Sequence, residues 1–393
     1  MMLDNFKKFQ AQTTNHPLGI EVIKAEGSYI YDRKKKYLDL VAGVSVQNLG
    51  HCNSELNKSI VNQLKKYSHV MVYGEFIQKP SLQLCELLNK ILPKNLNSTY
   101  LTNSGTEAIE AALKLAKRAT GRSRIISALN SYHGSTHGSM SVSGFEQRKR
   151  AYRPLLPNID FIKFNCESDI NQINQSTSCV ILETIQGGAG FIEPKHNFLK
   201  KISKKCKEVG SLLILDELQT GLGRTGKMFA FEHYEISPDI LVLGKSLGGG
   251  FPIGAMITDL SLMNKLKSKP ILGHITTFGG HPVISKAGLT TLKIILRDKL
   301  FEKAKISELK FRQRLKHPAI TEIRGKGLML ALILKSNELA KKLVIKSLEK
   351  GLILFWLLYE SRAVRITPPL NITNKEIKIS CDIILKTLDE IYN

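Results

Sequence analysis

Two charged side chains, Asp216 and Lys245, each follow a short apolar run in this sequence. Asp216 ends the run Leu212-Leu-Ile-Leu, and Lys245 follows Ile240-Leu-Val-Leu-Gly and precedes a group of glycines. Such runs are typical of buried parallel strands, whose carboxyl ends meet at one edge of a sheet. An amine that can form a Schiff base and an acid that keeps a pyridine nitrogen protonated are the two groups that a pyridoxal phosphate enzyme needs. An ordinary ion pair at two strand ends remains the alternative explanation.

A second segment, Ser104-Gly105-Thr106-Glu107, has the features of an anion-binding helix start. The residues after it place apolar side chains three and four positions apart, which predicts a helix. Ser104 suits the N-cap, and Glu107 three residues later completes a capping box. Gly105 lets the first N–H groups face outward, where they can bind a phosphate. A well-capped helix without a ligand explains this segment equally well by itself.

The composition indicates a globular protein of about two domains. The chain has 393 residues, of which 42% are hydrophobic, enough to bury a large core. No apolar stretch is as long as a membrane span, and the first residues lack a secretory signal. The six cysteines are scattered without a CxxC pair. We therefore expect a reduced, cytoplasmic setting with no disulfide framework and no metal site.

The formal net charge of +23 raises the question of a nucleic-acid partner. The lysines are spread in short runs such as Lys34-Lys-Lys36, without a basic arm or a nucleic-acid motif. We therefore expect no nucleic-acid partner and no membrane partner. A positive field should still attract an anionic cofactor and acidic substrates.

The order of the predicted elements indicates an α/β fold. A strand pair is expected near residues 27–32, and from about 55 to 280 helical patterns alternate with apolar strands. This alternation predicts a mostly parallel, doubly wound sheet. The strands are expected at 124–127, 179–183, 212–216 and 240–243.

The end of the chain has a different pattern, which predicts a smaller α+β domain. Helices are expected at 284–297, at 338–350 and from 374 onward, with an extended segment at 328–334. We therefore divide the chain into an N-terminal segment of the small domain (1–50), a large domain (51–283) and a C-terminal small domain (284–393).

Together these motifs resemble the class III (omega) aminotransferases, close to the acetylornithine and ornithine aminotransferases. The resemblance extends from Gly27 to Leu370. Its signature, Asp216-Glu-Leu-Gln219 followed by Lys245, is specific because the phosphate loop, the acid and the lysine occur in the family's order and spacing. It implies a pyridoxal 5′-phosphate enzyme of fold type I, with a large domain built on a seven-stranded type of sheet.

The resemblance also implies a role for each matching residue. Lys245 would form the Schiff base and then move a proton between the substrate carbon and the cofactor C4′, while Asp216 would keep the ring nitrogen protonated. Gln219 would hydrogen-bond the 3′-oxygen, and Arg365 would pair with a substrate carboxylate. The other cofactor-binding residues would be Ser104, Gly105, Thr106, Tyr132 (stacked on the ring), His133, Glu183 and Thr277.

Three positions bear on partners and specificity. Thr277 would reach the phosphate in the neighbouring subunit, which implies a homodimer with shared active sites. Gly188 stands where acetylornithine and ornithine enzymes usually carry a glutamate that pairs with the arginine matching Arg365, so Arg365 should stay free unless another acid, such as Glu360, pairs with it. Val44 stands where ornithine aminotransferases tend to have a tyrosine, which favours an acylated substrate.

The sequence therefore predicts an aminotransferase with ping-pong chemistry in arginine or lysine biosynthesis. The expected donor is N-acetylornithine or the similar succinyl-diaminopimelate, and the expected acceptor is 2-oxoglutarate. The alternatives are an ornithine delta-aminotransferase, a broader omega-aminotransferase, an aminomutase on the same fold, and a non-catalytic relative.

Overall fold

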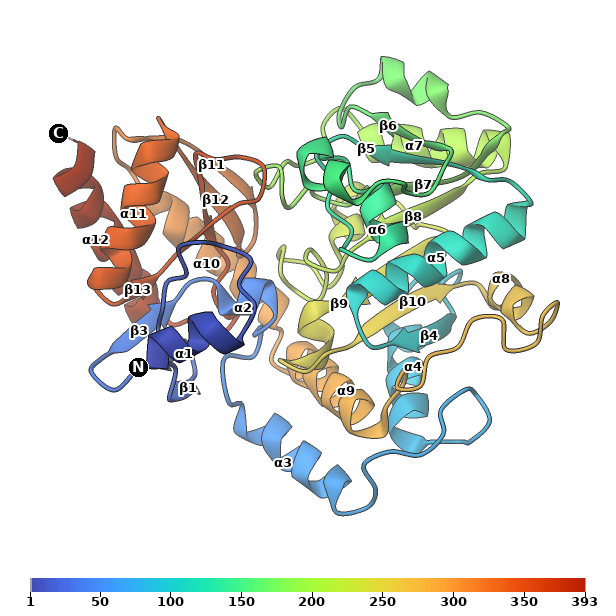
Figure 1. The fold of residues 1–393 in the computed structure, drawn as a ribbon, viewed down its shortest axis with the longest axis horizontal. Helices are drawn as coiled ribbons and strands as arrows, with labels where there is room; N and C mark the ends of the chain where they lie inside the picture. Colours follow the sequence, from blue (N-terminus) through green and yellow to red (C-terminus); the bar gives the residue numbers. More distant parts are fainter. Residues whose placement is uncertain (1, 393) are drawn as a thin grey trace.

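The computed structural model of the protein describes residues 2–392. Figure 1 shows two lobes, a larger one around an extended sheet and a smaller one in which the first and last segments of the chain lie together. The helix α9 (Pro282–Arg297) leads from the larger lobe toward the smaller one.

The larger lobe is built on a seven-stranded sheet in which only β10 runs antiparallel to its neighbours. The strands near residues 124, 179, 212 and 240 are confirmed, and the mostly parallel sheet is as predicted. Buried apolar side chains fill the central strands, as expected for a sheet covered on both faces. In spatial order the strands are β4 (Ser98–Thr102), β10 (Gly254–Thr258), β9 (Ile240–Gly244), β8 (Leu212–Asp216), β7 (Thr177–Glu183), β5 (Arg124–Ala128) and β6 (Ile159–Ile162).

Helix α5 (Gly105–Thr120) follows β4 and begins as the sequence predicts. The Ser104 hydroxyl accepts a hydrogen bond from the Glu107 N–H at 3.3 Å, which confirms the N-cap. The reciprocal bond differs from a standard capping box, because the Glu107 carboxylate accepts from the N–H of Asn103 at 2.8 Å. Gly121, at φ 69°, ends the helix in the left-handed conformation that favours glycine. The other helices of this lobe are α3 (Ser54–Leu64), α4 (Lys79–Ile91), α6 (His137–Val142), α7 (Phe198–Val209) and α8 (Leu260–Met263).

The smaller lobe contains two four-stranded sheets, one of which joins the two ends of the chain. In this sheet β13 (Leu352–Ile353) pairs in parallel with β3 (Lys36–Asp39), beside β2 (Tyr29–Tyr31) and β1 (Lys24–Glu26). The predicted strand pair near residue 30 is thus confirmed. The other sheet, in spatial order, consists of β11 (Ile320–Lys326), β12 (Met329–Leu334), β15 (Ala363–Ile366) and β14 (Phe355–Trp356).

The helices predicted at 284–297, 338–350 and from 374 are present, but the sequence did not predict α10 (Leu300–Arg314). This helix is rich in Lys, Arg and Glu and buries only four side chains, so its apolar periodicity is weak. The remaining helices of this lobe are α1 (Met2–Phe9), α2 (Ala42–Ser45), α11 (Asn337–Glu349) and α12 (Asn374–Tyr392).

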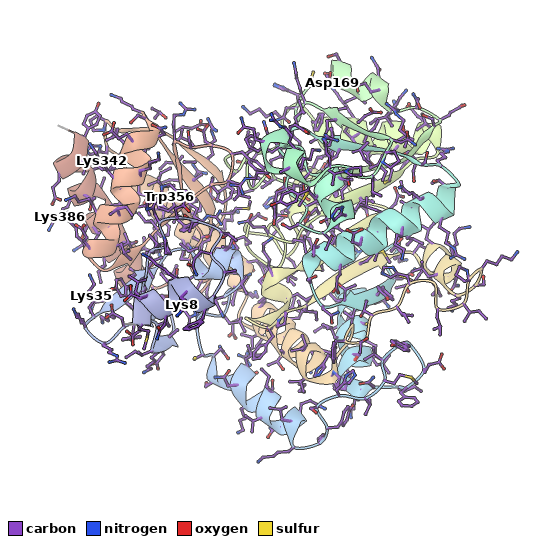
Figure 2. All side chains as sticks on the ribbon, in the orientation of Figure 1. Lys8, Lys35, Asp169, Lys342, Trp356 and Lys386 are labelled. Atoms are coloured by element: carbon purple, nitrogen blue, oxygen red, sulfur yellow. The ribbon has the colours of Figure 1, made fainter. Side chains whose placement is uncertain are left out.

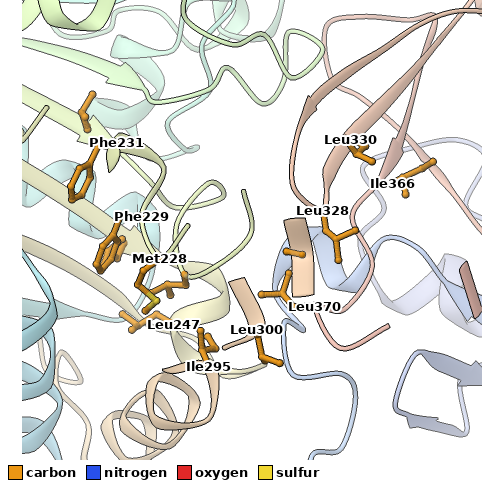
Figure 3. Close-up of a cluster of buried hydrophobic side chains, with 14 of the residues drawn as sticks. Met228, Phe229, Phe231, Leu247, Ile295, Leu300, Leu328, Leu330, Ile366 and Leu370 are labelled. Atoms are coloured by element: carbon orange, nitrogen blue, oxygen red, sulfur yellow. The ribbon is translucent and has the colours of Figure 1, made fainter. Parts of the chain in front are cut away.

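One apolar core connects the two lobes. Figure 3 shows buried side chains that run from Phe229 and Leu247 in the larger lobe to Leu328 and Leu370 in the smaller one. Beside this core, the fully buried Arg224 donates to the carbonyl oxygens of Leu328 at 2.9 Å and Pro368 at 2.6 Å. The junction between the lobes is therefore held by packing and by hydrogen bonds to a buried charge.

The excess positive charge lies on the outside of the molecule. Figure 2 shows Lys8, Lys35, Lys342 and Lys386 projecting from the surface of the smaller lobe. Within residues 2–392, no helix is long and apolar enough to cross a membrane. The same residues contain no group of three or more His, Cys, Asp or Glu side chains that is arranged to hold a metal ion.

Candidate active site

Asp216 lies at the carboxyl end of β8 and is almost completely buried, with 4% of its surface exposed. Its Oδ2 lies 2.8 Å from Nδ1 of His133, and its Oδ1 accepts a hydrogen bond from the Leu218 N–H at 3.0 Å. Both carboxylate oxygens are thereby fixed in position. His133 itself is 1% exposed, so the structure places it as a support for Asp216. The family resemblance predicts that His133 binds the cofactor, and no local sequence pattern indicates its pairing with Asp216.

Lys245 begins the short helix η5 (Lys245–Gly248) directly after β9, the strand next to β8. Its φ of 44° is strained for a residue with a side chain, and strain of this kind concentrates at functional sites. Within residues 2–392 its ammonium group has no hydrogen bond or ion pair. Burial lowers the pKa of Lys245, the charges of Asp216 and Glu183 oppose this shift, and Arg365 adds to it. A free amine with a lowered pKa suits a nucleophile.

Glu183 ends β7, directly beside Asp216 in the register of the sheet. Its carboxylate accepts hydrogen bonds from the N–H groups of Gly187 at 2.9 Å and Tyr132 at 3.1 Å. Burial raises the pKa of Glu183 to about 7, with Asp216 adding to the shift and His133 opposing it. Three adjacent strands thus deliver two acids and one amine to a single edge of the sheet.

A segment of the smaller lobe reaches this edge through Gln219. The Gln219 side-chain amide donates to the Ser45 hydroxyl at 3.1 Å. The backbone of Ala42, Gly43, Val44 and Ser45 is left-handed, with φ between 50° and 65°. Such a conformation is unfavourable for the β-branched Val44, which is also 38% exposed. The strain and the exposure together mark this turn as a candidate part of the site.

The start of α5 packs against the turn that follows Asp216. A β-carbon added to Gly105 would lie 2.4 Å from Cδ2 of Leu218, so any larger residue there would require the Leu218 side chain to move. The sequence pattern accounts for Gly105 only through the outward orientation of the first N–H groups of the helix. Within residues 2–392 the N–H groups of Gly105 and Thr106 have no acceptor, whereas the Thr106 hydroxyl is bonded to Thr136 at 2.8 Å and Ser139 at 2.7 Å. The two backbone groups are therefore the ones that can bind an anion.

Tyr132 and Thr277 differ in their surroundings. Tyr132 is 37% exposed, and its hydroxyl lies 3.2 Å from that of Ser135. Its N–H is held by Glu183, which places the tyrosine at the same edge of the sheet. Thr277 is exposed in the segment before α9, and no hydrogen bond joins it to the other candidates among the described residues. Contacts and strand register thus link Asp216, Glu183, Lys245, Gln219, Gly105, Tyr132 and His133, whereas no hydrogen bond links Thr277 to them among the described residues.

Arg365 lies on β15 and is 5% exposed. Its Nε donates to the carbonyl oxygen of Trp356 at 3.2 Å, while its buried Nη1 has no partner within residues 2–392. Burial lowers the pKa of Arg365 to about 10. Glu360, the alternative partner, pairs instead with Arg362 at 3.0 Å and with Arg324 at 3.6 Å. The guanidinium is therefore free for a carboxylate from outside the chain.

Gly188 leaves a space that a distant aromatic ring fills. A β-carbon on Gly188 would lie 2.8 Å from Cε2 of Tyr359, whose N–H donates to the Gly188 carbonyl oxygen at 2.9 Å. The ring of Tyr359 also stacks on Phe145 and lies under the guanidinium of Arg148. None of these three residues was predicted from the sequence, because no local motif links them.

The comparisons with known proteins identify the family. Residues 9–388 match the family described as aminotransferase class-III. The chain belongs to this family. It is 36% identical to an acetylornithine aminotransferase of Archaeoglobus fulgidus over 386 residues, which cover 98% of this chain and 99% of the relative. It is 35% identical to a [LysW]-aminoadipate semialdehyde/glutamate semialdehyde transaminase of Sulfolobus acidocaldarius, over 95% of this chain and 96% of the relative.

Solved structures of aminotransferases share the fold over nearly the whole length. The ornithine aminotransferase of Toxoplasma gondii superimposes with a TM-score of 0.92 at 28% identity, over all of this chain and 95% of that chain. An omega transaminase of Pseudomonas jessenii, solved in complex with PMP, gives a TM-score of 0.93 at 26% identity, over 99% and 98% of the two chains. The predicted family and the fold-type I architecture are confirmed, and the protein is an aminotransferase.

Proposed function

We propose that this aminotransferase uses pyridoxal 5′-phosphate to move an amino group from N-acetylornithine, or the similar succinyl-diaminopimelate, to 2-oxoglutarate. The observation that carries the proposal is the free amine of Lys245, one strand away from an aspartate whose two oxygens are fixed by hydrogen bonds. This pair of groups is what pyridoxal phosphate chemistry requires of a protein.

The described residues fit the cofactor. The free N–H groups of Gly105 and Thr106 at the start of α5 suit its phosphate, with Ser104 as the N-cap. Asp216 would hold the ring nitrogen, and Tyr132 would stack on the ring. The side chains of Gln219 and Glu183 would complete the surroundings of the ring. When bound, the cofactor supplies a ring that withdraws electrons from the reacting carbon.

The protein's own groups would then manage protons and charge. The Nζ of Lys245, with its lowered pKa, would accept a proton from the reacting carbon and return it at the cofactor C4′. Asp216 would keep the ring nitrogen protonated because His133 and the Leu218 N–H prevent its carboxylate from turning away. The rigid pair needs no reorganisation during the reaction, which favours the transition state.

The proposed substrate preference rests on two side chains that would contact the substrates, those of Arg365 and Val44. The free guanidinium of Arg365 suits a carboxylate of 2-oxoglutarate, and the small Val44 suits an acylated donor. The relative named acetylornithine aminotransferase supports this donor. The relatives named [LysW]-aminoadipate semialdehyde/glutamate semialdehyde transaminase favour a second candidate, the amine that corresponds to such a [LysW]-linked semialdehyde. Ornithine itself remains the third candidate.

We also propose that the protein is a homodimer in which Thr277 completes the partner's phosphate site. Exposed apolar side chains lie close to this residue in the chain and around a hollow of about 770 Å³, which the neighbouring Thr276 helps to line. A contiguous apolar patch on the surface of a globular protein favours association. The exposed side chains are those of Val70, Met71, Tyr73, Phe76, Ile77, Ile271, Leu272, Ile275 and Phe278.

The domain division and the cellular location belong to the same proposal. The pairing of β3 with β13 supports a small domain made of residues 1–50 and 284–393, with residues 51–283 as the large domain. The cysteines, all of them free, fit a cytoplasmic enzyme.

Single half-reactions test the proposal. The purified protein should absorb as a lysine-bound cofactor, and borohydride should fix that cofactor covalently on Lys245. N-acetylornithine should remove the absorbance band, and 2-oxoglutarate should restore it. A panel containing N-acetylornithine, succinyl-diaminopimelate, ornithine and the amine of a [LysW]-linked semialdehyde would identify the donor. Covalent fixation in Lys245→Ala would disprove the role of the lysine, and faster reaction of ornithine would disprove the proposed donor.

A further inference from the structure

The ring of Tyr359 lies beside the candidate active site, in the space that is left because residue 188 is a glycine. Its ring lies so close to Gly188 that a β-carbon there would be 2.8 Å from Cε2 and 2.9 Å from Cδ2. The pKa of Tyr359 is raised by burial and by the charge of Glu183, and Tyr132 adds to the shift. The phenol therefore lies within electrostatic reach of two residues at the edge of the sheet.

Phe145 and Arg148 hold this ring from a separate segment. The rings of Phe145 and Tyr359 stack with centroids 4.3 Å apart and an interplanar angle of 19°. The guanidinium carbon of Arg148 lies 5.7 Å from the centroid of Tyr359, within the range of a cation–π contact. The residues thus form an aromatic platform that carries a positive charge.

The charge of Arg148 is not neutralised by the protein. Within residues 2–392 its side chain has no ion pair and no hydrogen bond. The acid of its own segment, Glu146, is bound by Arg153 through both carboxylate oxygens, at 2.8 and 2.9 Å. An exposed arginine that is positioned by aromatic contact and has no acidic partner is available to an anionic ligand.

Arg148 and Arg365 act on different parts of the site. Arg365 is among the charges that lower the pKa of Lys245, so it lies near the reacting amine, whereas the charge of Arg148 acts on Tyr359. A keto acid with two carboxylates, such as 2-oxoglutarate, can use both positions. N-acetylornithine carries its carboxylate only at the end far from the reacting amine.

We propose that Arg148, held on the Tyr359 ring in the space left by Gly188, binds the carboxylate far from the reacting carbon in both the donor and the acceptor. Arg365 then binds only the carboxylate next to the keto group of the acceptor. This inference rests on the proposed function, since it assumes an omega-amine donor and a dicarboxylate acceptor. It assigns the discrimination between substrates with and without a far carboxylate to Arg148, to the Tyr359 ring that holds it, and to Gly188, which leaves space for that ring.

Matched substrate pairs test this assignment. The acceptor pair is 2-oxoglutarate and 2-oxovalerate, which has a methyl group in place of the far carboxylate. The donor pair is N-acetylornithine and N-acetylputrescine, which lacks the carboxylate. In Arg148→Gln the preference for the carboxylate-bearing member should fall about ten-fold in each pair, as expected for the loss of about 1.4 kcal/mol. Arg148→Lys should retain most of the preference because the charge remains.

The control is Arg150→Gln, which removes another exposed arginine two residues away and should leave both preferences unchanged. Unchanged preferences in Arg148→Gln would overturn the proposal. An equal loss for both members of a pair would also overturn it, since that result indicates only a structural role. Enzyme reconstituted with pyridoxamine phosphate allows the acceptor pair to be measured even if N-acetylornithine is not the donor, so the two proposals can fail separately.

Binding of an unreactive dicarboxylate provides a second measurement for the Tyr359 platform. Glutarate should bind the holoenzyme more tightly than pentanoate does, as measured by calorimetry. Tyr359→Phe keeps the ring and should keep this difference, whereas Tyr359→Leu should reduce it by several-fold. A difference that persists in Tyr359→Leu and in Arg148→Gln would show that the far carboxylate is bound elsewhere.

Discussion

Replacing Arg365 by methionine should stabilise the substrate-free protein and impair the acceptor half-reaction. Burial lowers the pKa of this arginine from 12.5 to about 10. Each pKa unit corresponds to about 1.4 kcal/mol, so burying the charged form costs about 3 kcal/mol. The folded pKa lies below the unfolded value, so this cost is fully present at neutral pH and declines only as the pH rises above 10. Methionine keeps most of the apolar stem without the charge, and we expect a net gain of about 1–3 kcal/mol.

Denaturant unfolding at pH 7.5, with and without 2-oxoglutarate, measures the effect. The ligand should raise the midpoint of the wild type, through mass action, and raise that of Arg365→Met by less, because only the carboxylate bound by Arg148 keeps its partner. The second-order rate constant of the acceptor half-reaction should fall at least ten-fold, which corresponds to the free energy of one charge-assisted hydrogen bond. The control Arg362→Met removes a half-buried arginine that pairs with Glu360 and should change neither quantity strongly. Breaking the hydrogen bonds of a satisfied buried group costs about 2 kcal/mol. If Arg365→Met loses more stability than that, the Arg365 guanidinium has a partner within the protein and our interpretation is wrong.

Three further substitutions test other parts of the structure. Asp216→Asn should keep the unfolding midpoint but lose most of the turnover, because the ring nitrogen is no longer held protonated; near-normal turnover would contradict that role. Gly188→Ala should cost about 1–3 kcal/mol in unfolding free energy, because the new methyl group would meet the Tyr359 ring, and Tyr359→Leu should relieve part of this cost; strictly additive effects would indicate another obstacle. Glu217 is buried with a pKa of about 7, above its ordinary value of 4.5, so its ionisation reduces wild-type stability as the pH rises between these values. The stability of Glu217→Gln relative to the wild type should therefore improve by about 2.5 kcal/mol from pH 5 to pH 8, and a constant difference would contradict the raised pKa.

Much of the large lobe could be predicted from the sequence because its signals are local. The strands that end in Glu183 and Asp216 and the strand before Lys245 are short apolar runs with clear ends. The start of α5 is a capping motif of four residues. In contrast, α10 escaped prediction because packing against other elements stabilises it more than its own periodicity indicates.

The sequence by itself determined which chemical groups stand at the ends of the strands, since the order of residues along a strand fixes that without reference to the rest of the chain. Only the tertiary structure decided what surrounds those groups. His133 supports Asp216, Ser45 binds Gln219, and Tyr359 fills the space beside Gly188. These contacts join segments that are far apart in the sequence, and they form only when the lobes pack around a common core. The physical reason is that a hydrogen bond or a ring contact depends on distance in space, which local patterns of polarity do not encode.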